Sequence, residues 1–174
     1  MYRKALLVLV LLLTPIGASA LSLPEPVARS FPDLRLAGEG RLRWFGLHIY
    51  DAALWISGVR WNGEQEFALD IRYARDVESR KLVQTSLDEM RRLGFADERR
   101  LGRWGHEMTR VLPDVRKGEH ITGVNRPATG VEFYLQGRLV GTIADPEFAR
   151  AFFAIWLDAR TREPDLRQSL IGSK

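Results

Sequence analysis

Residues 34–55 form the stretch LRLAGEGRLRWFGLHIYDAALW, which decides the class of fold. In both halves of this stretch, apolar side chains alternate with polar or small ones. The alternating apolar positions are Leu34, Leu36, Leu42 and Trp44, then Leu47, Ile49, Ala53 and Trp55. A period of two indicates β-strands with one buried face, and glycine between such runs favours a chain reversal. We therefore expect a β-hairpin that turns at Gly38-Glu39-Gly40.

The elements that follow show both periods. Alternation continues over residues 67–73, and apolar spacings of three and four then predict helices over 76–94 and 97–113. Strands are expected over 120–124, 130–135 and 138–143, and helices after Asp145 and over 163–170. Because strand blocks and helical blocks do not alternate strictly, the sequence predicts an α+β domain with an antiparallel sheet.

The first twenty residues have the composition of a secretory signal. Arg3 and Lys4 precede an apolar run over residues 5–13, and Ala18-Ser19-Ala20 ends the segment with small residues. The run is shorter than the roughly 20 residues that span a bilayer, so we expect cleavage after Ala20 and a periplasmic or secreted protein. A retained anchor is the alternative. Residues 21–174 are expected to form one domain, in which proline-rich residues 21–33 form an extended arm.

Composition excludes several kinds of site. The chain has no cysteine, so thiol catalysis and thiolate zinc sites are excluded, and packing alone must hold the fold together. Removal of the signal would reduce the net charge from +4 to +2. Such a balance does not predict a nucleic-acid partner, which requires a clustered basic face. The three histidines have no metal-ligand spacing, so no metal and no cofactor are expected.

Aromatic side chains are the most informative feature for function. They occur in nearly every expected element, in agreement with either a core that compensates for missing disulfides or an apolar cleft between sheet and helices. No motif for nucleophilic catalysis accompanies them.

Several ordered segments resemble chalcone isomerase-like proteins, and most closely their exported bacterial branch. They are Gly38–Gly40 with Leu47–Trp55, the 67–73 strand, Arg92-Leu93-Gly94, Leu112–Val115, Gly141–Phe148 and Phe152–Leu157. The resemblance covers about residues 34–171. It implies an open-faced β-sandwich, in which a large antiparallel sheet is covered by helices and a ligand cleft lies between them.

The resemblance also allows the functional positions of the plant enzymes, which close a chalcone ring, to be compared with this sequence. Their phenolate-stabilising arginine corresponds to Leu42, their threonine to Tyr50, and an asparagine to a position near Thr85. None of these residues is retained, which predicts that no catalytic residues remain. Non-catalytic members of the superfamily bind fatty acids in the same cleft.

These observations predict a protein that binds a small apolar ligand. We expect the cleft to be lined by Tyr50, Trp55, Phe148 and Phe152, with Thr85 nearby, and a ligand carboxylate to pair with Arg41 or Arg43 at its mouth. Strand alternation places both arginines opposite to Leu42, so an equally good interpretation is that they coat the hairpin edge. Two further alternatives are an isomerase or lyase with a rearranged site, and a structural or adaptor protein whose cleft is filled by its own aromatics.

Overall fold

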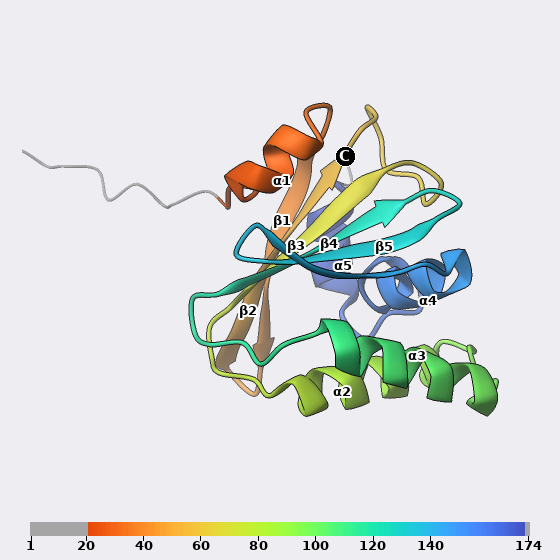
Figure 1. The fold of residues 1–174 in the computed structure, drawn as a ribbon. Helices are drawn as coiled ribbons and strands as arrows, with labels where there is room; N and C mark the ends of the chain where they lie inside the picture. Colours follow the sequence, from red (N-terminus) through yellow and green to blue (C-terminus); the bar gives the residue numbers. More distant parts are fainter. Residues whose placement is uncertain (1–20, 173–174) are drawn as a thin grey trace, which may run out of the picture.

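A single six-stranded antiparallel sheet forms the centre of the molecule (Figure 1). In the computed structural model, which describes residues 21–172, the strands follow one another in chain order across the sheet. They are β1 Arg35–Trp44, β2 Leu47–Ile56, β3 Phe67–Tyr73, β4 His120–Arg126, β5 Gly130–Leu135 and β6 Arg138–Ile143. The predicted α+β class with an antiparallel sheet is confirmed.

The described residues also form five helices: α1 Glu25–Ser30, α2 Ser79–Arg92, α3 Glu98–Val111, α4 Pro146–Leu157 and α5 Pro164–Ile171. On one face of the sheet, α3 packs on β6, α4 on β5 and α5 on β1. The remaining helix of this layer, α2, packs mainly on α3 and α4 rather than on a strand. Figure 1 shows α2 and α3 side by side in a layer displaced from the sheet. This arrangement leaves space between α2 and the strands.

Apolar side chains are buried on both faces of the sheet. The main core lies between the sheet and helices α2–α5. A smaller cluster lies on the opposite face, under α1 and the residues around it, and comprises Leu23, Val27, Phe31, Leu34, Ala68, Val124 and Tyr134. Residues 21–33 were predicted to be extended, and this was wrong in part, because a one-and-a-half-turn helix forms after Pro24. Its single fully buried side chain, Val27, anchors it on the sheet.

The expected chain reversal at Gly38–Gly40 was also wrong. Both glycines lie inside β1, and the hairpin turns at Phe45 and Gly46, whose φ values are +47° and +78°. The glycines are needed for close packing instead. A Cβ atom on Gly38 would lie 2.1 Å from the backbone oxygen of Ser169, so the missing side chain lets α5 approach β1.

Local capping explains where two helices begin. The side chain of Asp97 accepts hydrogen bonds from the backbone N–H groups of Arg99 and Arg100 at the start of α3. Asp145 does the same for α4, whose first residue is Pro146. Both helix starts agree with the sequence prediction, because an N-cap carboxylate satisfies N–H groups that have no partner within the helix.

The predicted signal peptide lies outside the described residues. Within residues 21–172, no helix has both the length and the apolar character needed to cross a membrane.

Candidate ligand cavity

A cavity of about 1140 Å³ opens between α2 and the sheet, in the space that α2 leaves above the strands. Its floor is the helix-facing side of the sheet, where Leu69 and Ile71 of β3 lie beside Ile121 of β4. These three positions share a face because strand side chains alternate with a period of two. The remaining walls come from α2, the hairpin β1–β2 and the second half of α4. Because the cavity is open, the structure favours a ligand-binding cleft over the alternative of a cleft filled by the protein's own aromatics.

Two tyrosines supply the polar groups at the wall. Tyr50 of β2 and Tyr73 of β3 are directly opposite in the sheet, and their ring centroids are 6.2 Å apart. The hydroxyl oxygen of Tyr50 accepts a hydrogen bond of 2.9 Å from Nε1 of Trp156 on α4. Among the described residues, the Tyr50 hydroxyl proton has no acceptor and the Tyr73 hydroxyl has no partner. Both O–H groups are therefore available to a ligand.

Burial keeps these tyrosines protonated. It raises the pKa of Tyr50 and of Tyr73 well above the ordinary value, because the phenolate form would lose its hydration. Each hydroxyl therefore remains a hydrogen-bond donor over the whole physiological pH range. A donor pair next to an apolar floor suits a ligand that has an apolar body and one hydrogen-bond-accepting end.

The mouth of the cavity carries charges of both signs. Arg75 and Lys81 line it without an ion pair to any residue in the described range, whereas Arg162 binds Glu89 at 2.8 Å. Glu163 lies on the same rim near Tyr50. Burial raises the pKa of Glu163, and the neighbouring carboxylates of Asp165 and Glu89 raise it further. Acids and bases alternate along this rim, and two of the pairs, Arg80 with Glu78 and Arg162 with Glu89, are within ion-pair distance.

Comparison with known proteins assigns the family. A model described as chalcone isomerase-like matches residues 18–172, which is most of the chain. The chain belongs to the chalcone isomerase-like family. The fold is also similar to the crystal structure of a fatty-acid binding protein from Arabidopsis thaliana, with a TM-score of 0.62 and 12% identity. The match covers 80% of this chain and 87% of the plant protein, and at this identity it supports the fold alone. A search of curated proteins finds no match.

The chalcone isomerase-like fold brings three of the seven predicted site residues to the cavity. Tyr50, Thr85 and Phe152 line it, from β2, α2 and α4 respectively. Leu42, at the position that the family resemblance assigns to an arginine, also lines the cavity and is paired with Tyr50 in the sheet register. A cation is therefore absent from that position of the wall.

The structure places the other four predicted residues elsewhere. Arg41 and Arg43 flank Leu42 but are not among the lining residues, and Nε of Arg41 binds Oδ1 of Asp51 at 2.6 Å. Their assignment to the mouth was wrong because neighbouring residues of a strand point to opposite faces. The assignment of Trp55 to the cavity lining was wrong for the same reason. It is five residues from Tyr50 and packs against the small cluster on the other face.

Phe148 was also assigned wrongly to the cavity. It is completely buried, and its ring centroid lies 5.8 Å from that of Trp104, 6.3 Å from Phe133 and 5.5 Å from Phe152. Phe152 is one helical turn further along α4 and lines the cavity, where its ring centroid lies 5.4 Å from that of Trp156. The stack fills the core beneath α3 and α4, whereas the space beneath α2 stays open.

Two residues that matter for the site were missed. Tyr73 continues the alternating series Phe67, Leu69 and Ile71, so the period of two already placed it on the face of the floor. Trp156 belongs to the apolar stripe of α4, but its contact with Tyr50 joins residues 106 positions apart, and no local signal indicates it.

A polar cluster on the opposite face of the sheet has a structural role. Nδ1 of His120 is 2.8 Å from Asp70, and Nε2 of His120 accepts a hydrogen bond of 2.8 Å from Nε of Arg72. Asp70 also accepts a hydrogen bond of 2.7 Å from the hydroxyl of Thr122. Both Asp70 and Thr122 are fully buried, so this hydroxyl is not accessible to a substrate. The bonds satisfy polar groups that would otherwise be costly to bury.

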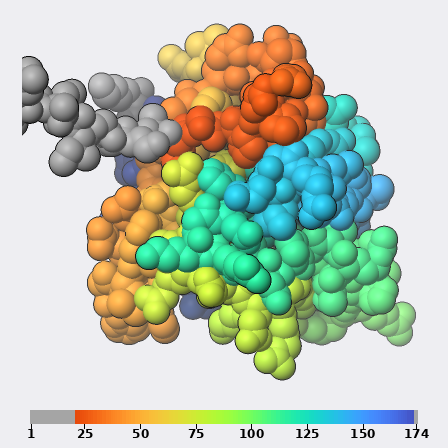
Figure 2. Space-filling view, turned by 60° about the vertical axis from the view of Figure 1, so that its left-hand side comes forward, coloured from red at the N-terminus to blue at the C-terminus, as the bar shows by residue number. Residues whose placement is uncertain are grey.

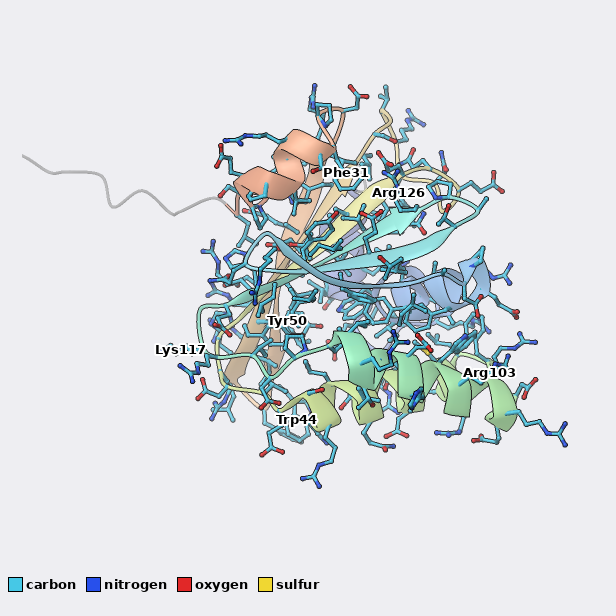
Figure 3. The ribbon with its side chains drawn as sticks, in the orientation of Figure 1. Phe31, Trp44, Tyr50, Arg103, Lys117 and Arg126 are labelled. Atoms are coloured by element: carbon cyan, nitrogen blue, oxygen red, sulfur yellow. The ribbon has the colours of Figure 1, made fainter. Side chains whose placement is uncertain are left out.

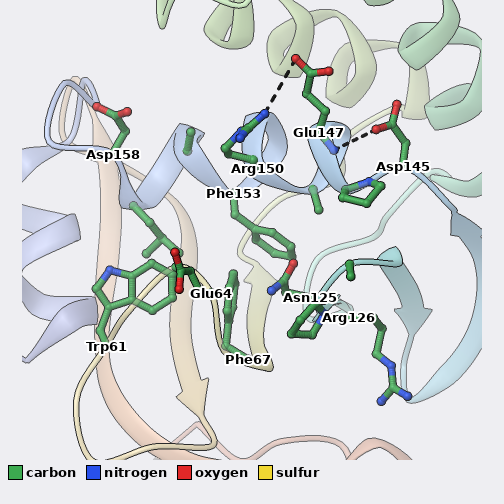
Figure 4. Close-up of a pocket in the computed structure, with 17 residues that line it drawn as sticks. Trp61, Glu64, Phe67, Asn125, Arg126, Asp145, Glu147, Arg150, Phe153 and Asp158 are labelled. Carbon is green, nitrogen blue, oxygen red and sulfur yellow. Dashed lines mark hydrogen bonds and ion pairs between the residues drawn. The ribbon is translucent and has the colours of Figure 1, made fainter.

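A second hollow of about 870 Å³ lies at the other end of α4, beside Trp61, Phe67 and Phe153 (Figure 4). Most of the charged groups around it already have partners. Glu147 binds Arg150 at 3.8 Å, and Asp145 caps α4. Because most of its charged groups already have partners, this hollow is a weaker candidate than the cavity beside Tyr50. In the described part of the chain, no three His, Asp or Glu side chains are grouped closely enough to hold a metal ion.

Proposed function

We propose that this protein is a non-catalytic binding protein for a small ligand with an apolar body and one polar end, such as a fatty acid. The observation that carries the proposal is the open cavity, which combines an apolar floor with two protonated tyrosines. Small-molecule sites in proteins have this composition, and volumes of roughly 300–1,000 Å³ are usual. The similar Arabidopsis thaliana structure is itself described as a fatty-acid binding protein.

In this proposal, the ligand's apolar part lies along Leu69, Ile71 and Ile121, and its polar end accepts hydrogen bonds from Tyr50 and Tyr73. In this position the apolar part of the ligand contacts apolar side chains, and its polar end contacts hydrogen-bond donors. The plant-like ring closure is not proposed, because it requires a cation to stabilise the developing phenolate and Leu42 occupies that position.

Export is part of the same proposal. Residues 1–20 are proposed to be a signal peptide that is cleaved after Ala20, as in the exported bacterial branch of the family, which places the protein in the periplasm or outside the cell. Leu21 and Leu23 are already buried in the domain, so cleavage at this point would leave every described contact intact. The intact mass of the protein recovered from a periplasmic fraction tests this. A mass that includes residues 1–20 would contradict cleavage.

Ligand binding is tested by native mass spectrometry of the exported protein, with solvent extraction of bound material, and by titration with a fluorescent fatty acid. Thr85→Trp places a bulky side chain at the cavity mouth from an exposed position of α2. Thr109→Trp is the matched control, since Thr109 is an exposed threonine of α3 that is not part of the lining.

We expect Thr85→Trp to weaken fatty-acid binding while Thr109→Trp binds like the original protein. An apo mass under all growth conditions, together with no saturable binding of the probe, would refute the proposal. A bound compound that is chemically converted during incubation would instead support the isomerase or lyase alternative.

A further inference from the structure

The turn of the β1–β2 hairpin exposes a cluster of large apolar side chains. Trp44 is 63% exposed, Phe45 88% and Leu47 50%. Trp44 and Leu47 are paired across the strands, and the rings of Trp44 and Phe45 are in contact, with centroids 4.8 Å apart. These three residues are called the hairpin tip below. Single exposed apolar residues are common, but a contiguous protruding group marks an interaction site.

The backbone of the tip is unusual for its sequence. Phe45 has φ +47° and Gly46 φ +78°, so both central residues of the turn are left-handed. Asn or Asp followed by Gly is the favoured pair in such turns, and a bulky side chain at the first position is strained. A phenylalanine at position 45 therefore does not stabilise the fold through its backbone conformation. It is also nearly fully exposed, so packing within the chain does not explain it either.

Within residues 21–172, several cations without an ion-pair partner lie at the same end of the sheet as the tip. The loops before α2 and before β4 lie at the same end of the sheet, and in the described part of the chain no acid forms an ion pair with Arg43, Arg75, Lys81, Arg116 or Lys117. Figure 3 shows Trp44 and Lys117 at this end, and in Figure 2 the orange hairpin lies beside the yellow-green and green segments that carry these loops.

Three acids of the same loops accept hydrogen bonds from backbone N–H groups. Asp76 accepts a hydrogen bond of 2.7 Å from the backbone N–H of Lys117, and Asp114 accepts one of 2.7 Å from that of Ser79. Glu119 accepts one of 2.8 Å from the N–H of Arg116. These carboxylates keep their charge, but cations outnumber acids at this end. The tip, the two loops and the first turn of α2 together carry Arg43, Arg75, Arg80, Lys81, Arg116 and Lys117 against Asp76, Glu78, Asp114 and Glu119.

We propose that the hairpin tip docks on the surface of an anionic lipid bilayer. Aromatic side chains, tryptophan above all, favour the interface between headgroups and acyl chains, and exposed arginine and lysine side chains attract anionic headgroups. Trp44 also lines the ligand cavity, so the docked tip would place the cavity mouth at the membrane surface. A second copy of this chain fits less well, because a protruding tip of three side chains is too small for the roughly 1,000 Å² that a stable interface buries.

The test is flotation with vesicles of phosphatidylcholine and phosphatidylglycerol in equal parts, compared with vesicles of phosphatidylcholine alone. Both the full chain and a chain that starts at Leu21, and so keeps every described element, are used. No free fatty acid is added, so flotation reports contact with the bilayer, whereas the titration described above reports uptake of a free ligand, and either result can fail without the other. We expect the protein to float with the anionic vesicles, and high salt to weaken this.

Phe45→Asn is the decisive variant, since asparagine suits a left-handed residue and the fold should become more stable, not less. We expect it to weaken vesicle binding about tenfold, from the apolar area that it removes from the bilayer. Val59→Ser is the matched control: Val59 is 99% exposed in the loop at the other end of β2, and its replacement should leave binding unchanged. Lys81→Gln with Lys117→Gln should reduce the preference for anionic vesicles, because two of the five unpaired cations are removed.

Three results would overturn the proposal. They are the absence of flotation, equal flotation of Phe45→Asn and the original protein, and concentration-dependent self-association that Phe45→Asn abolishes. The last would identify the tip as a contact between copies of the chain.

Discussion

Replacement of Tyr50 and Tyr73 by phenylalanine, one at a time, should separate stability from ligand binding. The two residues are neighbours on the cavity wall, and each change removes one hydroxyl oxygen. They differ in one respect. The oxygen of Tyr50 accepts the 2.9 Å hydrogen bond from Nε1 of Trp156, which ties β2 to α4, whereas the hydroxyl of Tyr73 has no partner in the described range.

The magnitudes follow from this difference. Tyr50→Phe leaves the half-buried indole N–H of Trp156 without its acceptor, which costs about 1–2 kcal/mol of unfolding free energy. For a domain of this size that corresponds to a fall in Tm of roughly 2–8 °C. Tyr73→Phe breaks no bond within the described residues, so its effect should stay within about 0.5 kcal/mol.

Ligand affinity should respond to both changes. If each hydroxyl donates to a ligand carboxylate, its loss costs about 1.5–3 kcal/mol, or roughly a 10- to 150-fold weaker Kd. The assays are urea unfolding of the ligand-free protein and titration with a fatty acid. Unchanged affinity in Tyr73→Phe would refute the placement of the ligand's polar end. Equal stability of the two variants would refute the role given to the Trp156 bond.

Three further changes test other parts of the molecule. Leu42→Arg puts a cation beside Tyr50. Titration should show that this variant binds a fatty acid more tightly but not the corresponding alcohol. An equal effect on both ligands would contradict the placement of the ligand's carboxylate at this wall. Glu163→Gln should raise Tm at neutral pH and have no effect below about pH 4, because a carboxyl whose pKa is raised by folding opposes folding once it ionises. A Tm difference that persists in acid would show another cause. Gly38→Ala should cost about 2–3 kcal/mol in urea unfolding, since its Cβ would lie 2.1 Å from a backbone oxygen of α5. Gly102→Ala, which has open space on α3, is the control and should be neutral or stabilising.

Several features of the cavity depended on packing that no local pattern indicates. The space exists because α2 packs on α3 and α4 instead of on the strands. Phe148 and Phe152 belong to the same apolar stripe of α4, yet one is sealed in the core and the other reaches the cavity. Their difference arises from what lies opposite each of them, Trp104 in one case and open space in the other.

Local patterns along the chain were enough to predict the α+β class, the alternation of the strands, and the capped starts of α3 and α4 at Asp97 and Asp145. These features depend on groups close together in the chain, namely alternating side chains and a carboxylate beside free N–H groups. The role of Gly38 follows only from the tertiary structure, in which α5 packs closely against β1 at this residue. A residue without a Cβ suits both a turn and close packing, so the sequence does not distinguish these two roles. The tertiary structure also decided that Tyr50 meets Trp156, since a contact across 106 residues depends on how whole elements pack and not on any local preference.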